Sequence, residues 1–232
     1  MKALLLLFKS KAAITALSML VSVFAYSLLW GWPYAVGFVV LIFLHEMGHF
    51  IAARQRGLDV GAPTFIPFVG AWIQLKQMPH DVETEAYVGL AGPVAGSAAA
   101  LACFEIARWQ GSPLMLALAY SGFMLNLFNL LPISPLDGGR VTAVISPRLW
   151  LLGAPILVLL FLWHPSPMFL LIAVLAAPHV MAAIKGNFDT AYYQSVPMTT
   201  RFNYGAAYIG LVIYLGAMTY SLHGELQQFT RS

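Results

Sequence analysis

The sequence is poor in charged residues and has almost no cysteine. Asp, Glu, Lys and Arg make up 9% of its 232 residues, whereas about a quarter of the residues of an ordinary soluble domain are charged. The one cysteine, Cys103, cannot form an internal disulfide, so the sequence excludes a disulfide framework and indicates no redox chemistry. The net charge of +3 comes from cations scattered between apolar runs. Because they form no basic patch, we expect no nucleic-acid partner.

Apolar residues are abundant and are gathered in long runs. The sequence is 60% hydrophobic with a mean hydropathy of +0.78, values typical of a polytopic membrane protein. The first run, Ala12 to Trp30, is longer than a typical signal-peptide core and leads directly into another, so we expect a retained span. Six more spans are predicted, the last less regular than the others: 34–53, 86–107, 114–131, 149–163, 168–184 and 204–222. The predicted fold is therefore an all-α polytopic membrane protein with six to seven transmembrane helices, in a single membrane domain over residues 1–232.

The stretch 57–85 is too polar and too rich in proline and glycine to form another span. Between Ala71 and Lys76 apolar and polar side chains alternate, as they do along a β-strand. We therefore expect a short β-hairpin or re-entrant segment after the second helix. Two interpretations stay open for Ile73, Gln74 and Leu75: they form a surface connector, or an edge that binds an extended substrate by strand addition.

Two histidines and a glutamate stand together in the second predicted span, in the sequence His45-Glu46-Met47-Gly48-His49. On a helix, residues four apart lie about 40° from each other on one face, one turn above the other. Ionisable residues are costly inside a membrane, so three of them within five positions indicate function. Two neutral imidazoles can bind zinc, while an adjacent unligated glutamate takes a proton from a zinc-bound water. We therefore predict His45 and His49 as metal ligands and Glu46 as the general base.

A second informative stretch runs from Asn129 to Arg140 and contains Leu136-Asp137-Gly138-Gly139. Two prolines interrupt the helix just before the aspartate, so the backbone can bend and direct the carboxylate where a regular helix could not. By itself, Asp-Gly-Gly is an ordinary turn. Beside a histidine pair that lacks a third ligand, Asp137 becomes the predicted third ligand of one metal ion.

The distribution of cations predicts the orientation of the chain. If the amino terminus is cytoplasmic, seven alternating spans leave ten of the twelve Lys and Arg residues inside, with only Arg108 and Arg231 outside. His45, His49 and Asp137 then lie on the same side at similar depths. At about 1.5 Å per residue, the metal would lie roughly 13 Å below the cytoplasmic boundary. The active site is thus expected nearer the cytoplasmic face.

Together, the two motifs resemble those of the site-2 proteases, a family of intramembrane zinc metalloproteases. The compatible core covers about residues 34–149. The resemblance implies that His45, His49 and Asp137 bind one Zn²⁺, that Glu46 is the catalytic base, and that Asn129 helps to hold the substrate carbonyl. It also implies single-span membrane proteins as substrates, cleaved within or near the membrane, and it favours the hairpin after the histidine helix.

Some features remain outside this resemblance. We expect neither the PDZ nor the cystathionine-synthase-type domain that some members carry, and the resemblance does not extend to the polar segment and possible extra helix in residues 186–232. Other hypotheses stay open: an inactive relative that binds membrane partners, an intramembrane zinc transporter, or a site for another divalent ion. An intact Glu46 argues against the first, and the scarcity of polar residues in the outer halves of the spans argues against the second. Substrate identity and oligomeric state are not predicted.

Overall fold

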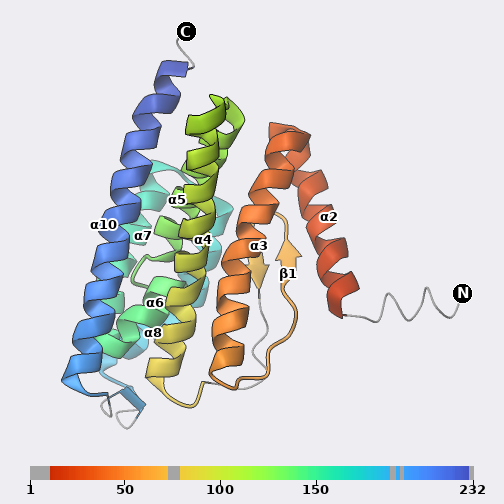
Figure 1. Ribbon diagram of the computed structural model, residues 1–232. Coiled ribbons are helices and arrows are strands. Elements are labelled where there is room, and N and C mark those ends of the chain that lie inside the picture. Colours follow the sequence, from red (N-terminus) through yellow and green to blue (C-terminus); the bar gives the residue numbers. More distant parts are fainter. Residues whose placement is uncertain (1–10, 73–78, 189–191, 194–195, 230–232) are drawn as a thin grey trace, which may run out of the picture.

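A computed structural model describes residues 11–72, 79–188, 192–193 and 196–229 of the chain. The described part is a bundle of helices with one small sheet (Figure 1). Its elements are α2 (Lys11–Trp30), α3 (Trp32–Gln55), β1 (Thr64–Ile66), β2 (Gly70–Trp72), α4 (Val82–Gln110), α5 (Pro113–Asn129), α6 (Asp137–Ile145), the 3-10 helix η1 (Pro147–Leu149), α7 (Trp150–Trp163), α8 (Pro167–Lys185) and α10 (Met198–Phe229).

Five of the described helices are long and apolar enough to cross a membrane: α2, α3, α4, α8 and α10. The shorter α5 and α7 are also apolar. Large apolar side chains point outward from these helices, among them Leu28, Leu162 and Val174, each about 70% exposed. Such a surface is stable when lipid covers it. The chain is therefore an all-α, integral multi-pass membrane protein, as its composition predicts.

The helix boundaries follow local signals in the sequence. Helix α4 begins at Val82, four residues before the predicted span, because the Asp81 side chain caps it by accepting a hydrogen bond from the Thr84 amide at 2.7 Å. Helices α5 and α8 each begin with a proline that follows a serine cap, Ser112 and Ser166. The helix α6 was not predicted, because the Asp-Gly-Gly sequence was interpreted only as a bend.

The sheet confirms the expected hairpin. Strands β1 and β2 are antiparallel, with Thr64 opposite Trp72 and Ile66 opposite Gly70. The turn between them uses positive φ at Phe68 and Gly70. Strand β1 packs on α2 and β2 packs on α3, so the hairpin lies between these two helices (Figure 1).

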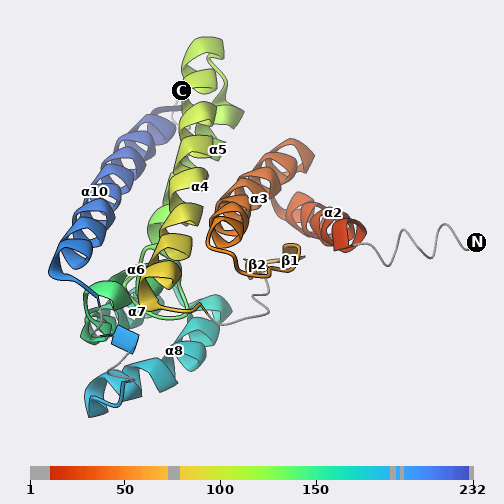
Figure 2. The ribbon, with the colours of Figure 1, turned by 60° about the horizontal axis from the view of Figure 1, so that its bottom comes forward.

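The helices form two groups around α4. In Figure 2, α2 and α3 lie on one side of α4 and α10 lies on the other, while α5 runs along α4 and contacts both α3 and α10. The α7–α8 pair packs against η1 beside α6. Helix α4 thus contacts α3, which carries the histidine pair, and α6, which carries Asp137. This position allows it to hold the two motifs together.

Candidate metal centre

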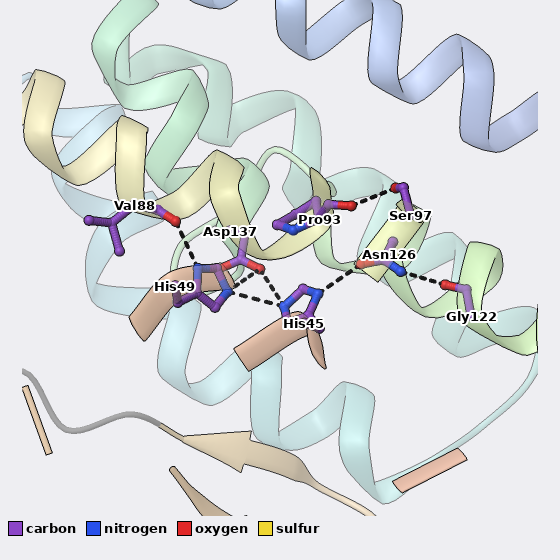
Figure 3. A network of polar contacts seen from close by, with 8 residues as sticks. All are labelled: His45, His49, Val88, Pro93, Ser97, Gly122, Asn126 and Asp137. Carbon is purple, nitrogen blue, oxygen red and sulfur yellow. Dashed lines mark hydrogen bonds and ion pairs between the residues drawn. The ribbon is translucent and has the colours of Figure 1, made fainter. Parts of the chain in front are cut away.

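The two histidines and Asp137 come together in the interior of the bundle. His45 and His49 lie one turn apart on α3, and Asp137 is the first residue of α6. In the close-up view, the three side chains point at one another (Figure 3). Each is at least 92% buried. The chain therefore brings two imidazoles and a carboxylate to one point where lipid and bulk water are largely excluded.

The distances among the donor atoms suit a single ion. The Nε2 atoms of His45 and His49 lie 3.1 Å apart, and each lies 3.2 Å from Oδ2 of Asp137. Donors bound about 2.0–2.1 Å from a tetrahedral zinc ion are roughly 3.3 Å from one another. All three donors lie within 4.8 Å of one another. The two-nitrogen, one-oxygen set also matches the ligands of catalytic zinc sites, which leave a fourth position for water.

The far side of each imidazole is fixed by a hydrogen bond. His45 Nδ1 donates to Oδ1 of Asn126 at 2.7 Å, and His49 Nδ1 donates to the carbonyl oxygen of Val88 at 2.7 Å. An amide or carbonyl oxygen only accepts, so each Nδ1 carries a proton and Nε2 is the ring nitrogen that faces Asp137. The Asn126 amide is itself oriented, because its Nδ2 donates to the Gly122 carbonyl at 2.7 Å.

Two glycines of α4 make room for this arrangement. A β-carbon at position 92 would overlap the His49 ring, and one at position 96 would overlap the Asn126 amide. Gly92 and Gly96 lie one turn apart, so the face of α4 that meets the site presents bare backbone. A side chain at position 92 or 96 would keep α4 farther from His49 and Asn126, so the two glycines permit this close approach.

The turn before α6 places Asp137. Helix α5 ends at Asn129, and Pro132 and Pro135 prevent a continuous helix into α6. Within this turn the Leu136 amide donates to the Ile133 carbonyl at 2.9 Å. Asp137 then begins α6, where its negative charge is favoured by the positive end of the helix dipole.

Glu46 is buried next to the three predicted ligands. Its side chain is 8% exposed, and its carboxylate is close enough to interact electrostatically with His45, His49 and Asp137, and also with Arg140. A buried carboxylate beside three donors, but outside their contacts, has the position expected of a proton acceptor.

The other predicted site residues have different outcomes. Asn129 lies at the end of α5, one turn beyond Asn126, and its role towards a substrate stays a prediction. Ile73, Gln74 and Leu75 lie outside the described residues. Asn126 was missed as a site residue. An asparagine in an apolar helix indicates only that a polar partner exists, and the sequence does not say on which helix.

Residues outside the site also meet at the end of the bundle where α4 begins. Tyr192 donates its hydroxyl to Oε2 of Glu85 at 3.2 Å, which connects the 186–197 segment with α4. Burial and the neighbouring Glu85 carboxylate raise the pKa of Tyr192 well above its usual value, so the phenol keeps its proton and remains a donor. Of the polar stretch that the sequence left unexplained, the described residues Tyr192, Tyr193 and Val196 pack in an apolar cluster with residues of α4 and α6.

Comparisons with known proteins find partial matches, and the family match includes the histidine motif. Residues 33–111 match Peptidase family M50. A zinc metalloprotease of Methanocaldococcus jannaschii is 28% identical over 127 residues, which cover 53% of this chain and 36% of the relative. A probable chloroplastic zinc metalloprotease of Arabidopsis thaliana is 28% identical over 156 residues, which cover 47% of this chain and 28% of the relative. The chain thus spans about a third of the length of these curated relatives. These matches confirm the resemblance to the site-2 proteases.

Proposed function

From the match to Peptidase family M50 and the geometry of the buried centre, we propose that the chain is an intramembrane zinc metalloprotease. It hydrolyses a peptide bond within or near the transmembrane segment of single-span membrane proteins. The observation that carries the proposal is the convergence of His45 Nε2, His49 Nε2 and Asp137 Oδ2, with Glu46 beside them. A packed structural cluster would need neither three donor atoms directed at one point nor an adjacent buried carboxylate.

His45, His49 and Asp137 would hold one zinc ion. When bound, zinc supplies Lewis-acid polarisation of a carbonyl and a lowered pKa for water, and both effects are stronger where bulk water is scarce. The chain's own contribution is to hold the donors in place. Val88 and Asn126 keep the two Nε2 atoms directed inward, so little reorganisation is needed when an ion enters.

Glu46 acts as the general base. Its carboxylate accepts a proton from the attacking water and returns it to the amine of the cleaved bond. Its neighbours on α3 are themselves ligands, so the carboxylate stays within reach of the reacting atoms without occupying a ligand position. Asn129, at the end of α5, is proposed to hold the substrate carbonyl.

The substrate must present an extended backbone. Amides of a transmembrane helix are protected by internal hydrogen bonds, so helix-breaking residues near the cleavage point should favour hydrolysis. Strand β2 packs next to α3, the helix that carries His45 and His49. We propose that the stretch following β2, with Ile73, Gln74 and Leu75, adds the substrate as a strand beside the site.

The experiment compares the wild-type chain with Glu46→Gln, both reconstituted in vesicles with candidate single-span proteins. The wild type should cleave within the span and lose activity to a zinc chelator. Glu46→Gln should bind zinc equally but cleave about a hundredfold to ten-thousandfold more slowly, as expected when a general base is removed. Cleavage by Glu46→Gln at the wild-type rate would refute the assigned role. Zinc flux into the vesicles without cleavage by the wild type would instead identify a transporter.

A further inference from the structure

Helix α10 makes two polar contacts with the stretch that carries Asp137. The Tyr208 hydroxyl donates to the Leu130 carbonyl at 2.6 Å, and Arg201 Nη1 donates to the Ile145 carbonyl at 2.5 Å. The two donors are seven residues apart, about two helical turns, so they lie on the same face of α10. Leu130 begins the turn before Asp137, and Ile145 ends α6. The contacts therefore hold the stretch 130–145 at both ends.

The contact at Leu130 is coupled to Asp137 by close packing. The Leu130 carbonyl lies so near Gly138 that a β-carbon on Gly138 would overlap it. Gly138 follows Asp137 directly, so a shift of this carbonyl is transmitted to the backbone of the predicted ligand. Leu130 is 2% exposed, and its carbonyl is one of those left at the end of α5 without a partner inside the helix. Tyr208 fixes where this carbonyl points.

The contact at Ile145 is one of several hydrogen bonds that the Arg201 side chain makes. The Arg201 guanidinium donates to the carbonyls of Ile145, Tyr193 and Val196. A cation at the C-terminal end of α6 is favoured by the helix dipole, and the planar group fixes the direction of several bonds together. It thereby joins the end of α6 to Tyr193 and Val196, which pack with residues of α4 and α6 in one apolar cluster.

We propose that Tyr208 and Arg201 are positioning residues for the metal site, through which α10 sets the distance between Asp137 and the histidines of α3. The inference rests on the proposed function. Other contacts of α10 are apolar: Leu215 and Leu222 pack in a cluster with α5, and Tyr204 packs in the cluster that contains Ala143 and Val144 of α6. These apolar contacts hold α10 against the bundle, and the two hydrogen bonds add a fixed direction at each end of the stretch 130–145.

The test measures zinc affinity of the full chain in detergent, by competition with a chromophoric chelator. Tyr208→Phe removes one hydroxyl and keeps the ring, and should weaken zinc binding about fivefold to tenfold, as expected for the loss of one hydrogen bond. Tyr214→Phe is the matched control: Tyr214 lies on α10 against the Phe123 ring, and no hydrogen bond of its hydroxyl is found among the described residues. It should bind zinc like the wild type.

A double-mutant cycle separates positioning from general loosening of the fold. In an Asp137→Asn background, Tyr208→Phe should cause no further loss, because its effect passes through the missing carboxylate. An equal loss in both backgrounds, or unchanged affinity of Tyr208→Phe, would overturn the inference. Cobalt(II) provides a second readout: Arg201→Gln and Tyr208→Phe should alter the visible absorption band of a bound cobalt ion, and Tyr214→Phe should not. If the wild type binds no zinc, the proposed function fails instead.

Discussion

The amide of Asn126 on α5 accepts the Nδ1 proton of His45 on α3 at 2.7 Å. The same amide donates to Gly122, so its oxygen cannot turn away without losing that bond. The contact fixes the ring of His45 and leaves its Nε2 free, which is the usual role of a hydrogen-bond partner behind a metal-binding histidine.

Asn126→Leu should weaken zinc binding about tenfold to a hundredfold, because it removes this acceptor while preserving volume. Asn129→Leu is the matched control one turn along the same helix. It should leave zinc affinity unchanged and slow cleavage, since Asn129 is proposed to act on the substrate. Chelator competition and cleavage assays on both variants check the prediction. Equal zinc affinity in the two variants would contradict the role of Asn126.

Gly92→Ala should displace the imidazole of His49, because a methyl group at this position overlaps the ring. Overpacking of this kind typically costs about 1–3 kcal/mol, so we expect a lower unfolding temperature and at least a tenfold loss of zinc affinity. Gly210→Ala on α10 offers a control, since no atom lies within 4 Å of a β-carbon placed there. That variant should bind zinc normally. Normal zinc binding by Gly92→Ala would show that His49 can be held in another position.

The orientation of the chain can be tested with single cysteines in a Cys103→Ser background. Met198 at the start of α10 and Trp109 at the end of α4 are 80% and 83% exposed and lie towards opposite ends of the bundle (Figure 1). The distribution of cations predicts that Met198→Cys faces the cytoplasm and Trp109→Cys the other side. In intact cells, a membrane-impermeant thiol reagent should label only Trp109→Cys. The reverse labelling pattern would invert the proposed topology.

Much of this structure follows from patterns that are local in the sequence. Apolar runs predict the long helices, because an unbroken helix is the least costly way to place backbone amides in lipid. The spacing of His45 and His49 predicts a shared face, because helical geometry alone decides it. The prolines and glycines between 57 and 85 exclude a continuous helix, and this local signal predicts the hairpin.

Other features depend on packing and could not be predicted. Helix α6 is nine residues long and begins Asp-Gly-Gly, a sequence of low helix propensity that is stabilised here by its neighbours. Trp150, for example, donates its Nε1 hydrogen to the Gly139 carbonyl at 2.9 Å. The choice of Asn126 over Asn129 as partner of His45 depends on how α3, α4 and α5 pack together. No pattern in the sequence of α5 distinguishes the two.

The distance in the sequence between His49 and Asp137 determines when the centre can form during synthesis. A nascent chain that has produced only α2 and α3 carries both histidines and Glu46 but not Asp137, the predicted third ligand. The third donor arrives with α6, and its two supports follow with α10. The centre is therefore complete only after α10 has been synthesised, and chains truncated before α10 should lack hydrolytic activity.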